Sequence, residues 1–213
     1  MNRRTSAPRS TYRHGDLKRA LLDAGIELAR AGGPDAVVLR EATRRAGVVP
    51  NAAYRHFASR ENLLQAVRAA ALAALALAME RELLRLRRGK PSVASARAWL
   101  RAVGTAYLRF ARAEPGLFRT AFSVRPDPGS DDVPRGVGKG GLGPFGLLGA
   151  ALDRLVESGA LVPSRRPGAE YLAWSAVHGL AMLLIDGPLR DLPRAPARKL
   201  GQRVLDMVEQ GLY

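Results

Sequence analysis

Apolar side chains recur at helical spacing along most of this chain, and this periodicity limits the fold more than any other feature. In residues 15–31, for example, Leu17, Leu21 and Leu28 share one face, and a Gly-Gly-Pro sequence at 32–34 ends the run. No segment alternates apolar and polar residues with the period of two that a half-buried strand requires. We therefore predict an all-α fold, with helices at residues 15–31, 39–46, 50–56, 59–88, 92–114, 115–122, 142–157, 167–186 and 194–211.

Composition restricts the class of protein further. The 213 residues suit one sizeable domain, or a small domain joined to a larger one, and they include no cysteine. Disulfide frameworks, zinc–thiolate sites and cysteine nucleophiles are thereby excluded. The net charge of +15 favours a phosphate-rich partner or an anionic surface. Only four of the 34 basic residues are lysine, however, and such arginine richness could also reflect a GC-rich coding bias.

No segment predicts a membrane partner. Residues 1–11 are basic and polar, with no apolar stretch after them, so they do not resemble a secretory signal. The longest nearly apolar run, 69–79, is much shorter than the ~20 residues that a bilayer requires. We expect a soluble cytoplasmic protein with a disordered basic tail at 1–11.

Two short helices joined by a tight turn form the motif that points to function. The helix at 39–46 is followed by Gly47, which can adopt the left-handed conformation that closes a helix. The second helix, at 50–56, begins with Pro50, where the missing N–H is harmless. This arrangement is a helix-turn-helix, which can place its second helix in the major groove of DNA. Many helical bundles contain such a pattern, so its context decides.

That context consists of the runs Tyr12-Arg13-His14-Gly15-Asp16-Leu17, Arg44-Arg45-Ala46-Gly47-Val48, Tyr54-Arg55-His56-Phe57 and Arg60-Glu61-Asn62-Leu63-Leu64. Together they resemble the amino-terminal domain of the TetR family of transcriptional regulators over about residues 12–64. Downstream, Trp174-Ser175-Ala176-Val177-His178-Gly179 is similar to the Trp-x-x-x-His-Gly signature of one carboxy-terminal class in that family. The resemblance implies a DNA-binding domain at 12–58 and a larger helical domain for ligand binding and dimerisation at 59–213.

The resemblance also makes the second short helix the recognition helix and double-stranded operator DNA the partner. Tyr54 and His56 would donate to phosphates, which sets register, while bases would be contacted nearer the helix start. Asn51 suits an adenine edge, Ala52 a thymine methyl group, and Arg55 either guanine or the backbone. The candidate DNA-binding residues are Arg40, Arg44, Arg45, Pro50, Asn51, Ala52, Tyr54, Arg55, His56 and Arg60.

Other interpretations of these residues stay open. Tyr54, His56 and Phe57 could instead form a core cluster around the short helices. Arg44 and Arg45 fit an exposed, solvated pair better than a pair of base-contacting residues.

The motif departs from the family pattern at several positions. Val38 and Val49 stand where serine or threonine commonly caps the two helices, and a valine cannot accept the orphan N–H bonds. Ala42-Thr43 replaces the usual pair of a large apolar residue and alanine where the helices pack. Arg60 replaces the common lysine and should keep its phosphate contact. We therefore expect DNA binding to persist without the family's usual contact near position 49.

In the carboxy-terminal domain, the resemblance implies that helices between 59 and 160 enclose a cavity for a small organic effector. We expect a mainly apolar or aromatic ligand with one polar handle, because ligand pockets are mostly apolar with few placed polar groups. Tyr107 or His178 could supply a hydrogen bond, although we favour a buried structural role for His178. The segment 123–141 predicts a mobile loop that could gate access. The candidate lining residues are Trp99, Tyr107, Phe110, Phe118, Phe122, Phe145, Trp174 and His178.

The last two helices, near 167–186 and 194–212, are implied to form a four-helix interface in a homodimer. A two-fold dimer would bind a near-palindrome, with half-sites separated by about one turn of DNA. The apolar stripe that we expect at this interface comprises Tyr171, Trp174, Ala181, Met182, Ile185, Val204, Leu205, Val208 and Leu212.

A homodimeric repressor that a ligand releases from DNA is thus the leading hypothesis. The alternatives are a constitutive basic DNA-binding protein without an effector and a small all-α enzyme. The enzyme is disfavoured because the sequence has no paired carboxylates, and His14, His56 and His178 are too scattered for a metal site. Residues 136–141 match G-x-G-x-x-G but follow no predicted strand, so we interpret them as a loop and expect no cofactor.

Overall fold

The computed structural model describes residues 14–86, 90–123 and 136–212, and the expected basic tail at 1–11 lies outside them. Within these ranges the regular structure is entirely helical, which confirms the all-α prediction. The elements are α1 (His14–Gly32), η1 (Pro34–Ala36), α2 (Leu39–Arg45), α3 (Pro50–Tyr54), α4 (Arg60–Leu83), α5 (Val93–Ala113), α6 (Pro115–Phe122), α7 (Pro144–Glu157), η2 (Pro163–Arg165), α8 (Ala169–Ile185) and α9 (Arg194–Gly211). Most bounds agree closely with the periodicity. The clearest exception is α4, which ends before the expected residue 88.

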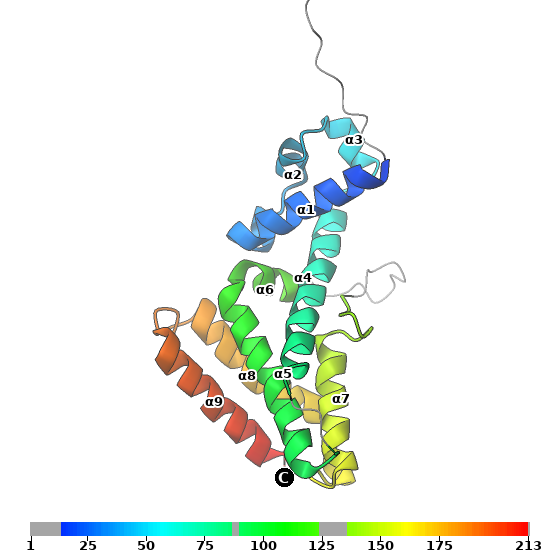
Figure 1. The fold of residues 1–213 in the computed structure, drawn as a ribbon. Helices are drawn as coiled ribbons and strands as arrows, with labels where there is room; N and C mark the ends of the chain where they lie inside the picture. Colours follow the sequence, from blue (N-terminus) through cyan, green and yellow to red (C-terminus); the bar gives the residue numbers. More distant parts are fainter. Residues whose placement is uncertain (1–13, 87–89, 124–135, 213) are drawn as a thin grey trace, which may run out of the picture.

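Helices α1, α2 and α3, with the short turn η1, form an N-terminal unit at one end of the molecule (Figure 1). Leu21 of α1 and Val37 after η1 are fully buried there, and Phe57 after α3 is nearly so. Their partners include Leu63 and Val67 from the first turns of α4, which packs against α1. The N-terminal unit therefore depends on α4 to complete its core.

Helix α4 runs from the N-terminal unit into the rest of the molecule (Figure 1). Ser59 caps it, because its hydroxyl oxygen accepts a hydrogen bond from the Asn62 amide at 3.2 Å. Its length and apolar composition would suit a membrane span, but it packs against α1, α5, α6 and α7. Leu75 and Met79 are fully or almost fully buried by these neighbours. Its apolar residues are therefore accounted for as core.

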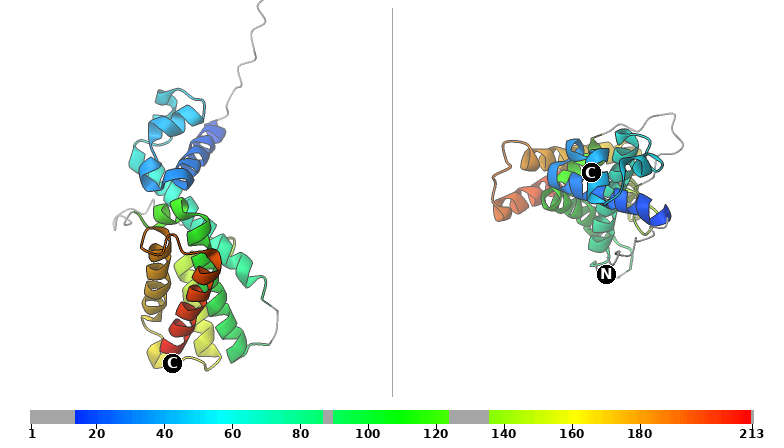
Figure 2. Two further views of the ribbon diagram at one scale, coloured as in Figure 1. Left: turned by 90° about the vertical axis from the view of Figure 1, so that its left-hand side faces the viewer. Right: turned by 90° about the horizontal axis from the view of Figure 1, so that it is seen from above.

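Helices α5 to α9 form a C-terminal body around α5, which contacts each of the other four (Figures 1 and 2). Ser92 and Ser95 form a capping box at the start of α5, in which each side chain hydrogen-bonds the backbone N–H of the other residue. Arg101 of α5 joins α9 through Gln202 at 3.0 Å and Glu209 at 3.1 Å, with Asp206 as a third partner. The position of α9 against the body is thus set by charge-assisted hydrogen bonds as well as by packing.

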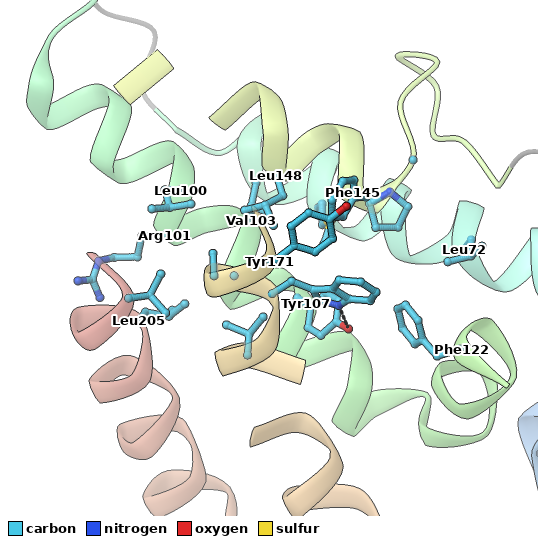
Figure 3. Close-up of a pocket in the computed structure, with 18 of the residues that line it drawn as sticks. Leu72, Leu100, Arg101, Val103, Tyr107, Phe122, Phe145, Leu148, Tyr171 and Leu205 are labelled. Atoms are coloured by element: carbon cyan, nitrogen blue, oxygen red, sulfur yellow. Dashed lines mark hydrogen bonds between the residues drawn. The ribbon is translucent and has the colours of Figure 1, made fainter. Parts of the chain in front are cut away.

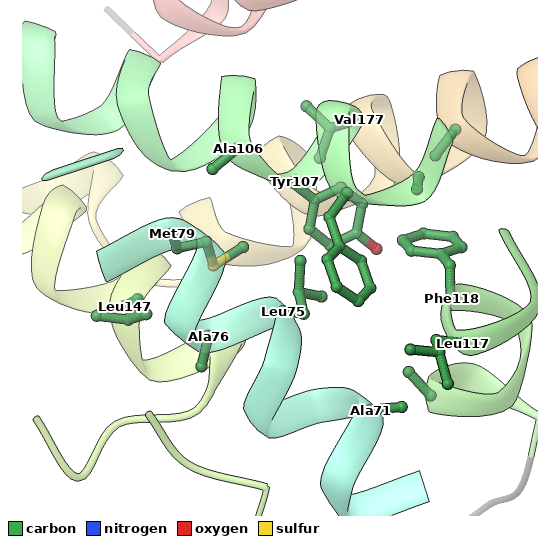
Figure 4. Packing of buried hydrophobic residues seen from close by; sticks show 14 of the residues in the cluster. Ala71, Leu75, Ala76, Met79, Ala106, Tyr107, Leu117, Phe118, Leu147 and Val177 are labelled. Atoms are coloured by element: carbon green, nitrogen blue, oxygen red, sulfur yellow. The ribbon is translucent and has the colours of Figure 1, made fainter. Parts of the chain in front are cut away.

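The core between α4 and the body includes side chains from α4, α5, α6, α7 and α8 (Figure 4). Leu75 and Met79 of α4, Tyr107 of α5 and Phe118 of α6 belong to it, and all four are almost completely buried. The rings of Tyr107 and Phe118 meet edge to face with centroids 5.3 Å apart, a favoured aromatic geometry. This core therefore joins α4, which reaches the N-terminal unit, to the helices of the body that pack against it.

The N-terminal unit meets the C-terminal body where α1 touches the start of α6. A Cβ atom on Gly116 would collide with the carbonyl oxygen of Ala29 and lie 2.5 Å from that of Arg30. Only glycine permits so close an approach of two backbones. Beside it, Arg30 Nε donates to a carboxylate oxygen of Glu114 at 2.9 Å. The end of α1 and the start of α6 are therefore in close backbone contact.

Candidate nucleic-acid interface and ligand cavity

Helices α2 and α3 form the expected helix-turn-helix at the far tip of the N-terminal unit (Figure 1). Gly47 has a φ of 68°, the left-handed conformation that the sequence requires at this position. The amide of Val48 donates to the Thr43 carbonyl at 3.2 Å and closes the turn. Ala42 and Ala53 are fully buried and hold the two helices on α1.

The departures from the family pattern have clear local consequences. Val38 and Val49 occupy the two N-cap positions, and neither supplies a side-chain hydrogen bond. Val49 is 69% exposed, so an apolar side chain stands at the start of α3. The hydroxyl of Thr43 is buried but donates to the Leu39 carbonyl at 2.7 Å. Threonine is thus accommodated in the helix packing without an unsatisfied polar group.

The outer face of α3 and the residues that follow it carry the expected contact groups. Asn51, Tyr54 and Arg55 are exposed, whereas Ala52 and His56 are partly buried. Tyr54 is 57% exposed, which excludes the alternative in which its ring belongs to a core cluster. The helix itself ends at Tyr54, so Arg55 and His56 lie in the turn after it rather than in the expected recognition helix.

Helix α2, the first helix of the motif, contributes three arginines. Arg40, Arg44 and Arg45 are exposed. Arg44 Nε and Nη2 each donate to a separate oxygen of Glu41 at 2.8 Å, and Arg45 Nε donates to the same carboxylate at 3.0 Å. These hydrogen bonds lower the pKa of Glu41 to about 2. Arg44 and Arg45 therefore form an exposed, internally paired cluster, in keeping with the solvated interpretation.

Arg60 has two backbone partners. Its Nε donates to the Val37 carbonyl at 2.8 Å and its Nη2 to the Pro34 carbonyl at 2.9 Å. The guanidinium is directed toward the backbone around η1, where it ties α4 to the N-terminal unit. A lysine at this position has too few fixed donors to reproduce such a fork. These two bonds leave further N–H donors on the guanidinium, so the phosphate contact expected of Arg60 stays a prediction.

A cavity of about 460 Å³ lies in the C-terminal body, within the range typical of small-molecule sites (Figure 3). Residues from α4, α5, α6, α7, α8 and α9 line it, together with Gly136 and Gly143. Four of the expected aromatic residues are among them: Tyr107, Phe122, Phe145 and Trp174.

The other four expected residues do not line this cavity. Phe118 is fully buried and Phe110 is almost so, because both turn toward the core instead. Trp99 lies beneath the guanidinium of Arg154, 3.7 Å from the ring centroid, in a cation–π contact. His178 contacts the rings of Phe118, Phe122 and Trp174, which places it behind the wall. Helical spacing identified these as inward-facing residues but could not say what they face.

Some of the wall residues that the sequence analysis missed lie along one face of α4. Arg68, Leu72 and Met79 recur at helical spacing, a signal that could have identified them. Further lining residues come from α5, α7, α8 and α9: Leu100, Arg101, Val103, Gly104, Pro144, Leu148, Tyr171, Ala173, Val177, Leu205, Val208 and Glu209.

Tyr107, Trp174 and His178 form a hydrogen-bonded chain at the cavity wall. Trp174 Nε1 can only donate, and it lies 3.0 Å from the Tyr107 hydroxyl oxygen. The hydroxyl is also 2.7 Å from Nδ1 of His178, and the tautomer of the imidazole decides which of the two donates. Burial lowers the pKa of His178 and raises that of Tyr107, which favours the neutral form of both groups.

Part of the segment expected to act as a gate is instead held in place. The amides of Lys139 and Gly140 donate to the two carboxylate oxygens of Glu80 at 2.9 and 2.8 Å. Gly138 N donates to the Leu142 carbonyl at 2.9 Å, which closes the turn. Residues 139 and 140 are thus hydrogen-bonded to α4, and Gly136 of the same segment lines the cavity. The earlier part of the expected gate, 124–135, lies outside the described residues. In the described parts of the chain, no His, Asp and Glu group could hold a metal ion.

The outer surface of α8 also differs from the expected stripe. Ala181, Leu205 and Leu212 are buried within the body, and Trp174 and Val208 line the cavity. Tyr171 of the expected stripe is 62% exposed, and three apolar residues outside that stripe are exposed as well: Leu172 and Leu183 of α8 and Met207 of α9. The exposed apolar face of α8 and α9 therefore overlaps the expected stripe only in part.

A helix-turn-helix joined by a long helix to a helical body that contains a cavity is the architecture of a DNA-binding regulator. Residues 21–67 match the family described as bacterial regulatory proteins, tetR family, and residues 100–208 match the tetracyclin repressor-like C-terminal domain. The chain belongs to the TetR family of transcriptional regulators. Members of this family are DNA-binding regulators rather than enzymes, so the enzyme alternative is set aside.

Two solved structures illustrate the likeness. A protein of unknown function from Rhodococcus sp. RHA1 is 25% identical, with a TM-score of 0.74 over 96% of this chain and 99% of that one. PfmR, a TetR family transcriptional regulator from Thermus thermophilus, is 21% identical, with a TM-score of 0.58 over 91% and 98% of the two chains. The second likeness supports the fold alone. No curated protein matches the sequence significantly.

Proposed function

We propose that this regulator is a homodimeric repressor that binds a near-palindromic operator and leaves it when a small organic ligand enters the C-terminal body. The observation that carries the proposal is the position of α6 between cavity and N-terminal unit. Phe122 at its end lines the cavity, and Gly116 at its start abuts the backbone of α1. A ligand that displaces Phe122 would thus shift the helix-turn-helix.

The proposed DNA contacts are the exposed groups at the tip of the N-terminal unit. Asn51 and Arg55 are placed to reach base edges, and Tyr54 to donate to a phosphate. Arg40 of α2 adds positive charge beside them. We assign this role to the segment 12–58, with the remainder of the chain as the ligand-binding and dimerisation domain.

The proposed dimer interface is the outer face of α8 with the neighbouring surface of α9. Leu172 and Leu183 are 67% and 43% exposed on α8, and Met207 is 58% exposed on α9. Between the two leucines, no atom approaches within 4 Å of the place where Gly179 would carry a Cβ. A helix that is apolar on both its inner and outer faces normally has both covered. Two-fold pairing of α8 and α9 would cover this face and set the distance between two α3 helices.

Ligand release requires a differential affinity. The ligand must bind more tightly to a form in which the two helix-turn-helix units are wrongly spaced for the operator, because equal affinity for both forms shifts nothing. A protein that binds DNA constitutively remains the competing function, and the cavity is the feature that it leaves unexplained. Operation on chromosomal DNA would place the protein in the cytoplasm.

Footprinting on the DNA upstream of the protein's own gene tests the proposal. We expect two protected half-sites whose centres lie about one turn of DNA apart, ~34–36 Å, or a multiple of this. Light scattering of the full-length protein should give the mass of a dimer. Protection without sequence preference and with a steep salt dependence would favour the constitutive DNA-binding protein.

A further inference from the structure

The charged and polar groups of the cavity wall are unequally satisfied. At one end, Arg101 is paired with Glu209 and with Asp206, so its charge is balanced (Figure 3). In the middle, the Tyr107 hydroxyl accepts from Trp174 and shares a second hydrogen bond with His178. The hydrogen-bonding capacity and charge of these groups are already matched by protein partners, so a ligand would add little to them.

Arg68 is the exception. It lines the cavity from α4, one turn before Leu72, and Figure 3 shows Leu72 on the opposite side of the cavity from Arg101. Its side chain is partly buried, its Nε is fully buried, and no hydrogen bond or ion pair joins it to any residue in the described ranges. Burial alone lowers the pKa of this guanidinium, since no neighbouring carboxylate offsets the desolvation.

The neighbouring turn of α4 contains a second unsatisfied group. The side-chain oxygen of Gln65 is likewise buried without a partner, and it and Arg68 Nε are the two such atoms in the described residues. Buried polar groups are nearly always hydrogen-bonded, so a pair of exceptions on one helix face calls for an explanation. A wall that presents an uncompensated cation to an otherwise apolar space is complementary to an anion.

We infer that the cavity selects an elongated apolar monocarboxylate, whose carboxylate pairs with Arg68 while its apolar chain follows α4 toward Met79. This inference rests on the proposed ligand switch and specifies its chemistry. A guanidinium matches a carboxylate with two parallel N–H···O bonds, and partial burial protects the pair from screening by salt. Arg68 and Met79 are eleven residues apart on one helix, which corresponds to about 16 Å of wall.

The position of Arg68 also gives the ligand leverage. The first turns of α4 pack on α1, and Arg68 follows Val67, a fully buried residue of that shared core. A carboxylate anchored at this point acts on the helix that carries the N-terminal unit. An uncharged ligand of the same shape would fill the cavity without that anchor.

Binding of three probes to the full-length protein, measured by calorimetry in the absence of DNA, tests the inference. We expect decanoate to bind at least about tenfold more tightly than decanol, the gain typical of a hydrogen bond to a charged group. Decyltrimethylammonium should bind more weakly than decanol, because it brings a second cation to Arg68. All three are used below their micellar concentrations.

Variants assign the preference to one residue. Arg68→Met should abolish the advantage of decanoate over decanol while leaving decanol binding unchanged, and Arg68→Lys should keep part of it. Arg19→Met removes the same charge from an exposed site on α1 and should change nothing. If Arg68→Met fails to fold, the comparison of probes on the unmodified protein still decides.

Equal affinity for decanoate and decanol, or tightest binding of the ammonium probe, would overturn the inference. So would an undiminished preference for decanoate in a folded Arg68→Met protein. These outcomes are separate from failure of the proposed function, which would appear as decanoate binding that leaves operator affinity unchanged.

Discussion

The N-terminal unit and the C-terminal body build their functional surfaces in opposite ways. The proposed DNA contacts come from two short helices and one turn, within about twenty consecutive residues, and their key side chains are exposed. The cavity draws its wall from six helices, α4 to α9, and among its lining side chains Tyr107 is buried and Arg68, Phe122 and Trp174 are half-buried. A local motif therefore forms the first surface, whereas the second exists only once distant segments have packed.

The two regions also satisfy their polar groups differently. Val38 and Val49 leave both helices of the motif without a side-chain cap, so α2 and α3 forgo a common source of local stability. In the body, the Tyr107 hydroxyl is fully hydrogen-bonded within the wall. We expect the N-terminal unit to respond mainly to changes in capping and contact with α4, and the body to respond to changes in packing.

The largest effect is expected at the junction of the two regions. Gly116→Ala places a methyl group against the carbonyl oxygens of Ala29 and Arg30 and should lower the free energy of unfolding by about 3 kcal/mol. Gly149→Ala is the matched control, because its Cβ would meet only side-chain ends at 3.7 Å. That change should be neutral or slightly stabilising. Chemical denaturation measures both, and equal stability of the two variants would show that the α1–α6 contact is not tight.

The next largest effect on stability is expected when a tyrosine hydroxyl is removed from the cavity wall rather than from the proposed DNA-binding surface. Tyr107→Phe removes a hydroxyl that serves both Trp174 and His178, and we expect a loss of about 2 kcal/mol in stability. Tyr54→Phe removes an exposed hydroxyl, so stability should stay within about 0.5 kcal/mol.

DNA binding should respond in the reverse sense. Tyr54→Phe should weaken binding to all sequences by about 1 kcal/mol through loss of a phosphate contact. Wild-type affinity in titrations with operator DNA would remove Tyr54 from the proposed contacts. Tyr107→Phe, once folded, should keep operator affinity in the absence of ligand.

A smaller effect is expected at the uncapped start of α3. Val49 already has the extended backbone of an N-cap residue, with φ −73° and ψ 144°. Val49→Thr should therefore supply the absent hydrogen bond without rearrangement and raise stability by about 1 kcal/mol. Val137→Thr, an exposed valine away from any helix start, is the control and should be neutral. If both variants are equally stable, the missing cap is already compensated.

The smallest effect is a pH dependence within the body. His178 has a lowered pKa because it is buried, and the unfolded chain therefore takes up a proton that the folded protein resists. Stability should fall as pH drops below about 6.5, the ordinary pKa of histidine, and be retained above it. His178→Asn should reduce the slope of unfolding free energy against pH. An unchanged slope would assign the dependence to other groups.

Sequence reasoning was most successful where structure is decided locally. Helix bounds followed from apolar spacing, and Gly47 adopted the left-handed conformation that its turn requires. It was less successful for side chains whose surroundings depend on another helix. Trp99 and Phe110 were predicted to line the cavity. Trp99 instead stacks under Arg154, and Phe110 is buried in the core.

The sequence by itself determined that this chain is all-helical, that it carries a helix-turn-helix near its start, and that it belongs with the TetR regulators. Periodicity and turn conformation suffice for the first two, because both act between residues a few positions apart. The family follows instead from the resemblance of motif runs such as Tyr54-Arg55-His56-Phe57. Only the tertiary structure decided that Arg60 binds the backbone of its own unit and that Arg68 faces the cavity without a partner. Spacing places a side chain on a helix face, but the rotation and packing of neighbouring helices determine what that face meets.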